Sequence, residues 1–196
     1  MPGPARSGEP GILAHAPAMA SRIVLRPSTD AELPAIAAIY GWHVAHGTGT
    51  FELEPPSESD MAARRADVLE RGLPWLVAEE DGRVLGYAYA NQFRPRPAYR
   101  HCLEDSIYLA HDAMGRGVGR ALLAELLARC EAAGARQMLA VIGDSANAGS
   151  IGVHRTLGFE PAGILRSAGW KFGRWLDVVL MQKRLGFGDT TPPERA

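Results

Sequence analysis

Long apolar runs are missing from this sequence, and so is an excess of either charge. No run approaches the roughly 18 residues of a membrane-spanning helix, so we expect no membrane segment. Lys and Arg total 21 against 22 Asp and Glu, a balance that offers no basic surface for nucleic acid. The two cysteines, Cys102 and Cys130, form no C-x-x-C motif, so reduced thiols in a cytoplasmic protein are expected.

The two ends of the chain differ in composition from the middle. Residues 1–21 are rich in Pro, Gly and Ala without periodicity, so we expect a disordered extension. They also lack the charged start and the apolar block of roughly 7 to 15 residues that mark a signal peptide. Residues 186–196 form an equally loose tail. The remaining stretch, 22–185, suits a single α/β domain, since 46% of the chain is hydrophobic.

Strand and helix signals alternate along this stretch. Thr29 and Glu32 form a capping box before one helix, and Asp81-Gly82 is a strong hairpin turn. We also expect a turn at 169–175, between the last two strands. Strands that bracket helices in this order predict a mixed central sheet. The expected strands are 22–26, 75–80, 83–93, a short one around 107–109, 137–142, 159–165 and 176–183, and the expected helices are 30–45, 57–71, 117–133 and 147–157.

Segment 104–119 carries the clearest functional signal. A short apolar strand around Ile107 leads into a turn with Gly115, Gly117 and Gly119, and a helix follows directly. Glycines let main-chain amides approach a ligand without interference from Cβ, and the start of a helix adds unpaired amides. The pattern therefore predicts an anion site. It has neither the Lys of a Walker loop nor the glycine spacing of a dinucleotide fingerprint.

Other features leave alternatives open. His43 and His46 could share a metal, but two ligands make no site and no third is in view. Phe51, at the centre of the loop 47–52, either plugs the core or forms a wall of a substrate pocket. A stretch rich in Arg and Pro is either a solvated loop or a carboxylate clamp, because guanidinium forks bind carboxylates bidentately. Its candidate residues are Arg94, Arg96, Tyr99 and Arg100.

Several motifs resemble those of the GNAT acetyltransferase superfamily. The loop M-G-R-G-V-G at 114–119 resembles the [QR]-x-x-G-x-[GA] loop that holds the pyrophosphate of acetyl-CoA, with Met114 in place of the usual Gln or Arg. N-x-x-S at 147–150 and H-R-x-L-G-F at 154–159 resemble the second CoA-contacting helix. More closely, the chain is similar to the phosphinothricin and methionine sulfoximine N-acetyltransferases, in segments 47–52, 98–100, 104–109 and 171–177.

The resemblance implies the GNAT fold, a central, twisted, mixed and mostly antiparallel sheet of about six or seven strands with about four flanking helices. It also implies an acetyl-CoA-dependent N-acetyltransferase without a metal. The acceptor would be the α-amino group of phosphinothricin, methionine sulfoximine, methionine sulfone or a similar small molecule, attacking directly in a ternary complex. Herbicide or antibiotic resistance and a homodimer are further implications.

Two residues take catalytic roles by this resemblance. An amino acid amine is largely protonated near pH 7, so a base must accept its proton, and the matching carboxylate is Glu104. Its place just before an apolar strand predicts partial burial and a raised pKa, whereas Asp105 would project to the opposite face. His154 matches the group that protonates the leaving thiolate, although a core His satisfied by hydrogen bonds is an open alternative.

Binding roles follow from the same resemblance. Contacts to acetyl-CoA are expected from main-chain amides that also stabilise the oxyanion, and from the glycine loop and the second helix; these residues are Ile107, Tyr108, Leu109, Gly115, Arg116, Gly117, Val118, Gly119, Arg120, Asn147 and Ser150. Contacts to the acceptor are expected from Arg94 and Arg100 foremost, then from Arg96, Tyr99, Phe51 and Trp175, the last of these from a second subunit.

Two other functions stay open on the sequence alone. The same chemistry could act on another amine or on a protein N-terminus, although the Pro-stiffened, Arg-rich loop favours a closed pocket over an open groove. The chain could also be a non-catalytic acyl-CoA sensor, a function that needs no base at Glu104.

Overall fold

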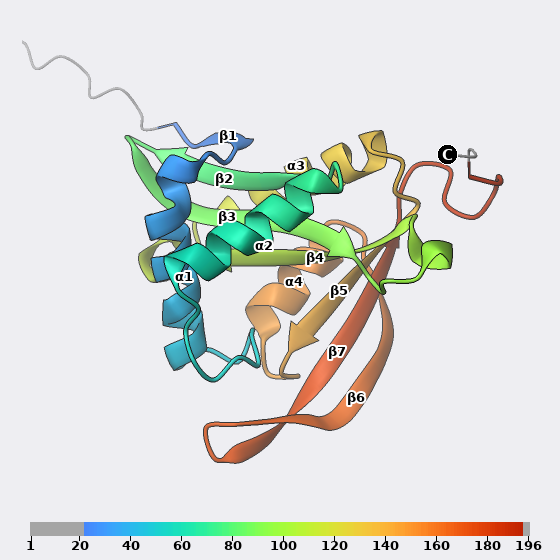
Figure 1. Ribbon diagram of the computed structural model, residues 1–196. Coiled ribbons are helices and arrows are strands. Elements are labelled where there is room, and N and C mark those ends of the chain that lie inside the picture. Colours follow the sequence, from blue (N-terminus) through green and yellow to red (C-terminus); the bar gives the residue numbers. More distant parts are fainter. Residues whose placement is uncertain (1–21, 194–196) are drawn as a thin grey trace, which may run out of the picture.

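A seven-stranded sheet runs through the computed structural model, which describes residues 22–193 (Figure 1). Of the neighbouring strand pairs in this described part, one is parallel, β4 with β5, and the others are antiparallel. The predicted mixed, mostly antiparallel sheet is confirmed. In sheet order the strands are β1 (Val24–Pro27), β2 (Trp75–Glu80), β3 (Arg83–Gln92), β4 (Cys102–Leu109), β5 (Gln137–Gly143), β7 (Arg174–Arg184) and β6 (Glu160–Lys171).

Helices cover both faces of the sheet (Figure 1). Strand alternation sends Trp75 and Val77 of β2 into one core and Leu76 and Ala78 into the other. The first core packs beneath α1 and α2, and the second beneath α3. The helices are α1 (Leu33–His46), α2 (Glu58–Glu70), α3 (Val118–Ala132) and α4 (Ala148–Thr156).

Local capping sets where the first helices begin. The side chain of Glu32 accepts a hydrogen bond from the Thr29 amide, which confirms the predicted capping box. The first turn after it, Asp30–Glu32, is a 3₁₀ turn, and α1 follows. Ser57 and Asp60 form a second capping box at the start of α2, so the helix starts just after Ser57.

The last two strands are longer than predicted. The expected seven-residue turn at 169–175 is wrong, because Trp170 pairs with Trp175 and Lys171 with Arg174. Only Phe172 and Gly173 form the turn, with φ of +53° and +71°, the left-handed values that suit a two-residue hairpin. Trp170 and Trp175 therefore extend the ladder of paired strands. The β6–β7 hairpin therefore projects from the sheet, at the bottom of Figure 1.

The described part of the C-terminal tail, residues 186–193, forms turns beside β7. The guanidinium of Arg136 lies 5.5 Å from the centre of the Phe187 ring and bonds to Thr191 Oγ1. The expected extension at 1–21 and the final residues 194–196 lie outside the described residues. The domain limits stay a prediction.

Candidate active site

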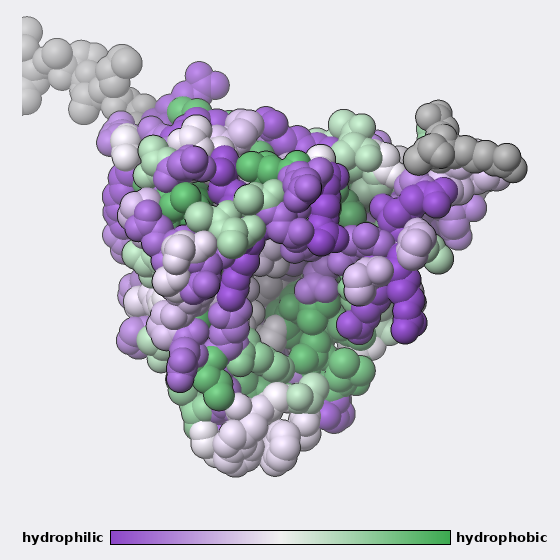
Figure 2. All heavy atoms as spheres, in the orientation of Figure 1, coloured by the Kyte–Doolittle hydropathy of each residue, from purple (hydrophilic) through white to green (hydrophobic). Residues whose placement is uncertain are grey.

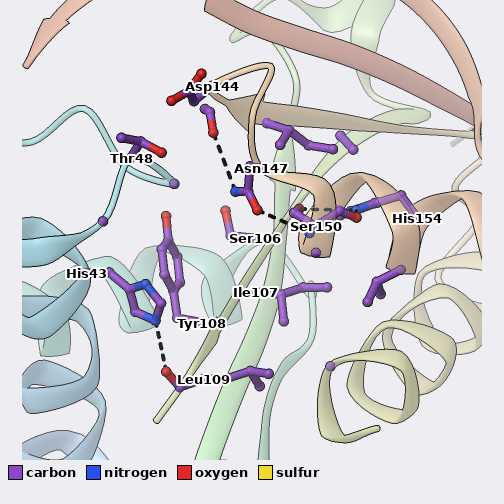
Figure 3. A pocket seen from close by; sticks show the side chains of 18 of the residues that line it. His43, Thr48, Ser106, Ile107, Tyr108, Leu109, Asp144, Asn147, Ser150 and His154 are labelled. Carbon is purple, nitrogen blue, oxygen red and sulfur yellow. Dashed lines mark hydrogen bonds between the residues drawn. The ribbon is translucent and has the colours of Figure 1, made fainter. Parts of the chain in front are cut away.

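Strands β4 and β5 separate in the middle of the sheet. Their pairing runs from Cys102 with Gln137 to Asp105 with Ala140 and ends there, whereas β4 stays paired with β3 as far as Leu109. Residues 106–109 therefore border an opening on their β5 side. A cavity of about 880 Å³ fills it, between the end of α1, the glycine loop, β5 and α4 (Figure 3). We call the place where the two strands part the fork.

The glycine loop forms one wall of the cavity. Gly115 and Gly117 have φ of +74° and +82°, a region that side chains avoid, so both positions need glycine. Gly117 is the N-cap of α3, and no side chain in the described structure caps this helix start. The first amides of α3 are therefore available to an anion. Met114, Gly115, Gly117, Gly119 and Arg120 line the cavity, as the sequence predicts for a phosphate cradle.

Two loop residues expected to bind the cofactor turn their side chains elsewhere. The guanidinium of Arg116 binds both carboxylate oxygens of Glu80, at 2.8 and 2.6 Å, and so ties the loop to the β2–β3 hairpin. The side chain of Val118 is fully buried in the core. The side chains of Arg116 and Val118 are therefore engaged elsewhere in this arrangement, and neither residue is among those that line the cavity.

Helix α4 forms another wall, across the cavity from His43 (Figure 3). The Asn147 side chain caps it by accepting the Ser150 amide, and both residues line the cavity. His154 follows one turn later and is 4% exposed. Its Nδ1 lies 2.7 Å from the Ser150 carbonyl oxygen, and its Nε2 lies 2.9 Å from Asp105 Oδ2.

These contacts bear on the expected proton donor. A ring with both nitrogens engaged by buried acceptors has no N–H left to point at a leaving group. The geometry therefore matches the alternative of a hydrogen-bonded core His, and it gives no support to direct protonation of a thiolate by His154. Asp105 does face away from Glu104, as strand alternation predicts.

Glu104 lies inside β4 and not just before the strand as predicted, because Leu103 and Asp105 already alternate into the core. Its side chain is half-buried and lines the cavity. Burial raises the pKa of the Glu104 carboxyl, the negative charge of Asp105 raises it further, and the positive charge of Arg94 lowers it, with a net rise. A carboxylate with a raised pKa beside a cavity is suited to accept a proton.

The expected clamp residues sit on the exposed loop that joins β3 to β4, which contains a short 3₁₀ turn, Pro97–Tyr99. Arg94 lies over the Phe93 ring, 4.8 Å from its centre, and it is close enough to lower the pKa of Glu104. The Arg100 Nε donates to His101 at 3.0 Å. None of the four candidates is among the residues that line the cavity in the described structure, so the clamp is not assembled there.

Phe51 acts as a plug. Its ring packs on the backbone at Gly143 and Gly169, where an added Cβ would lie 3.1 and 2.3 Å from the ring. The buried Lys171 donates from Nζ to the carbonyl oxygens of Gly47, at 2.9 Å, and Thr50, at 2.8 Å. These contacts fix the loop 47–52 against the β6–β7 hairpin. Thr48 and Gly49 of this loop line the cavity, whereas Phe51 does not.

Trp175 lies outside the cavity on the hairpin. It is 62% exposed and meets Trp170, 56% exposed, edge to face at 5.2 Å. Within one chain it therefore cannot be the pocket wall that the resemblance implied. Pale and green residues in the lower part of Figure 2 cover the region where Figure 1 shows the hairpin.

Several residues that line the cavity were missed in the sequence, among them His43, Thr48, Asp144 and Arg174. His43 was considered only for a metal, yet its Nε2 bonds to the Leu109 carbonyl oxygen at 2.8 Å (Figure 3). Asp144 has φ of +73° and accepts a hydrogen bond from Arg174 at 2.6 Å. Thr48 comes from the loop after α1. Their position along the chain could have revealed them, since they lie at or just after the ends of α1 and β5 or at the start of β7.

Among the described residues no three potential ligands cluster for a metal.

Comparison with known proteins gives one consistent family. The model of the acetyltransferase (GNAT) family matches residues 36–159. A phosphinothricin N-acetyltransferase from Alcaligenes faecalis is 58% identical over 170 residues, which cover 87% of this chain and 86% of that protein. An L-methionine sulfoximine/L-methionine sulfone acetyltransferase from Pseudomonas aeruginosa is 43% identical over 165 residues, covering 82% and 94%.

A solved structure agrees. The crystal structure of a phosphinothricin acetyltransferase from Sinorhizobium meliloti in complex with acetyl-CoA superimposes with a TM-score of 0.86 at 48% identity. The match covers 90% of this chain and 95% of that one. No helix in the described part of this chain is long and apolar enough to cross a membrane.

Proposed function

Since this chain belongs to the GNAT acetyltransferase family and is an N-acetyltransferase, we propose that it acetylates the α-amino group of a small amino-acid-like acceptor, using acetyl-CoA. The acceptor is of the phosphinothricin, methionine sulfoximine or methionine sulfone type, the substrates for which similar enzymes are named. The observation that best supports the proposal is the half-buried Glu104 carboxylate, which lines the cavity and whose raised pKa suits it to accept a proton.

Acetyl-CoA fits the walls of this cavity. Residues 115–120 would hold its diphosphate on main-chain amides, because Gly115 and Gly117 take left-handed conformations and the start of α3 is uncapped. Residues 107–109, free of β5, would pair with its extended arm through their main chain. Bound there, it supplies a thioester whose carbonyl carbon is open to attack by an amine.

Glu104 accepts the proton of the acceptor ammonium, directly or through a water, and so frees the nitrogen lone pair for attack in a ternary complex. Main-chain amides near 107–109 donate to the oxyanion that develops on the carbonyl oxygen, and preorganised donors of this kind are worth roughly 3 kcal/mol each. Collapse of this intermediate breaks the carbon–sulfur bond and releases the CoA thiolate, which takes up the second proton of the nitrogen directly or through solvent. The loop 47–52, fixed by Lys171, closes the cavity on the side of the acceptor.

A panel assay tests the substrate class. The chain is incubated with acetyl-CoA and single amines, and the released thiol is measured. Methionine sulfoximine, methionine sulfone or phosphinothricin should give a kcat/KM at least about tenfold above those of the unmodified amino acids and of short peptides. Preference for a peptide N-terminus would instead support the other acceptor class, and turnover with none of these amines would contradict the proposal.

Removal of the Arg94 guanidinium is expected to weaken binding of the acceptor carboxylate. Arg94→Ala should raise the acceptor KM about five- to tenfold, since a charge-assisted hydrogen bond is lost at a partly solvated site, and should leave the KM of acetyl-CoA unchanged. Arg100 interacts with His101 instead, so Arg100→Ala serves as the matched comparison and should change the acceptor KM less. Equal effects of the two variants would show that the clamp is not centred on Arg94.

Two copies of the chain are expected to associate through the β6–β7 hairpin. β6 is the last strand of the sheet, and exposed apolar side chains gather on its hairpin, including Ile164, Leu165, Trp170, Phe172 and Trp175. Such a patch indicates a protein interface. From a partner copy, Trp175 could reach the acceptor side of the cavity, which it does not reach in its own chain.

Light scattering tests this association. The wild-type chain should run with twice the 21.0 kDa mass of one chain. Trp175→Glu should shift the population towards monomer at micromolar concentration, because a charge would be buried in the apolar contact. Phe187→Glu, which changes an equally exposed aromatic residue at the other end of β7, is the control. A monomeric wild type would refute the dimer.

A further inference from the structure

The pair formed by Asp105 and His154 has an unusual proton count. Each ring nitrogen of His154 lies within hydrogen-bond distance of an oxygen, Ser150 O at 2.7 Å and Asp105 Oδ2 at 2.9 Å. A backbone carbonyl only accepts, and so does an ionised carboxylate. A neutral imidazole has one N–H and cannot serve both. The Ser150 hydroxyl lies farther from Nδ1, at 3.4 Å, and does not replace the carbonyl contact. With an ionised Asp105, the contacts are therefore satisfied together when His154 is an imidazolium with N–H on both nitrogens.

The surroundings of the pair strengthen this assignment. The side chains of His154 and Asp105 are 5% and 3% exposed. Asp105 Oδ1 has no hydrogen-bond partner among the described residues, so the imidazolium is the group that balances this buried carboxylate. Burial alone would lower the pKa of His154, but the hydrogen bond and charge of Asp105 and the Ser150 carbonyl raise it, with a net rise.

Few other charged or titratable groups face the pair. On β4, Glu104 lies next to Asp105 and interacts with its charge. On α3, burial raises the pKa of the Cys130 thiol to about 12, and the negative charge of the nearby Asp105 adds to the rise. On β7, Lys183 approaches Gly158, just after α4. Next along the chain from His154, Arg155 is exposed. The Phe159 ring meets the imidazole edge to face at 4.9 Å.

The position of the pair relates it to the cavity. Asp105 is the last β4 residue that pairs with β5, and the fork opens at the next residue. His154 comes from α4, whose Asn147 and Ser150 line the cavity. The pair therefore joins α4 to β4 at the residue where β4 parts from β5. We propose that Asp105 is a positioning residue that keeps His154 doubly protonated, and that this charged contact holds α4 against β4 for binding of the acyl-CoA. The identity of that ligand rests on the proposed function.

Loss of the proton should loosen the contact. Without it, either the Nε2 lone pair faces the Asp105 carboxylate or the Nδ1 lone pair faces the Ser150 carbonyl, and one buried hydrogen bond becomes a repulsion. Because the pKa of His154 is raised on folding, its contribution to stability is complete below the unfolded value of about 6.5 and is lost as pH rises through the folded value. Affinity for CoA should fall over the same alkaline range.

The first test needs no ligand. In protein labelled with ¹⁵N in histidine, the ring signals of His154 are assigned by their loss in His154→Gln. At pH 7 both nitrogens should appear protonated. In Asp105→Asn the amide NH₂ can donate to Nε2 while Nδ1–H keeps its bond to Ser150, so a neutral ring is expected, with Nδ1 alone protonated. A single protonated nitrogen in the wild type at pH 7 would overturn the proposal.

The second test measures the dissociation constant of CoA by calorimetry from pH 7 to pH 10. Wild type should weaken about tenfold more than Asp105→Asn across this range, the loss expected for one buried hydrogen bond. CoA itself also titrates in this range, but it does so equally in both experiments. The difference in pH dependence between wild type and Asp105→Asn therefore measures the effect of the Asp105–His154 pair. Asp105→Ala should bind weakly throughout, and Asp67→Asn, changed in an exposed ion pair of α2, should follow wild type.

Turnover separates positioning from proton donation. A positioning role predicts that Asp105→Asn at pH 7 raises the KM of acetyl-CoA a few-fold, because the charged contact is lost, and leaves kcat within about twofold of wild type. If His154 instead protonates the leaving thiolate, Asp105→Asn should lower kcat and leave that KM unchanged. This result, or identical pH dependence of CoA binding in wild type and Asp105→Asn, would refute the proposal. Absence of turnover with every amine would count against the proposed function alone.

Discussion

Glu104→Gln is expected to lower kcat/KM for the amine acceptor by about 10²-fold or more, while CoA affinity stays within about twofold of wild type. The amide keeps the size of the side chain but cannot accept a proton, so the acceptor stays an unreactive ammonium. Glu104 borders the cavity beside the fork and is separate from the glycine loop. Steady-state kinetics with calorimetry of CoA binding measures both quantities.

The pH profile gives the same variant a second readout. Because the pKa of Glu104 is raised, the wild-type kcat/KM should fall as pH drops through that raised value, where the carboxylate takes up its proton. Glu104→Gln should lack this acid limb. Glu70→Gln, at the exposed end of α2, is the matched control. Wild-type rates in Glu104→Gln would remove this residue from the mechanism.

Gly143→Ala is expected to lower the free energy of unfolding by about 1–3 kcal/mol and to raise the acceptor KM about tenfold. A Cβ on Gly143 would lie 2.0 Å from the main-chain oxygen of Thr48, and backbone cannot rotate away as a side chain can. The loop 47–52 would have to move, although Lys171 holds it in place. Thermal unfolding should shift downward by roughly 2–4 °C for each kcal/mol.

Gly152→Ala is the matched control for that change. Gly152 lies in α4, and an added Cβ would meet nothing within 4 Å. Since alanine favours a helix, this variant should be more stable than wild type by roughly 0.5–1 kcal/mol, with an unchanged acceptor KM. If Gly143→Ala keeps wild-type stability and acceptor KM, the loop does not form the acceptor wall.

The sequence predicted what short-range patterns encode. Three such features each depend on a few neighbouring residues with definite backbone preferences: the capping box at Thr29, the hairpin turn at Asp81-Gly82 and the glycine loop around Gly117. All three occur in the structure. The order of strand and helix signals predicted a mixed central sheet. The family resemblance added that its pairing is mostly antiparallel, which is a property of the whole chain that no local pattern contains.

Contacts between distant segments could not be read in this way. His154 and Asp105 are 49 positions apart, and Lys171 and Thr50 are 121 apart. Nothing in either local sequence reveals that an ammonium or an imidazole will be buried and paired. The same limit explains Arg116, whose guanidinium binds Glu80, 36 positions away, although its place in a phosphate-binding loop suggested a ligand contact.

The buried ammonium of Lys171 has a consequence for engineering. The segment 47–52, which we propose closes the acceptor side, and the hairpin that carries the exposed tryptophans are joined through this cation and through the Phe51 ring packed on Gly169. Substrate selectivity therefore depends on both segments together. If residues 47–52 alone were replaced by those of a homologue, the new loop would lack the hairpin residues that hold it in place. Chimeras that exchange this segment together with the tip of the hairpin should retain a defined substrate preference, whereas exchange of either piece alone should blur it.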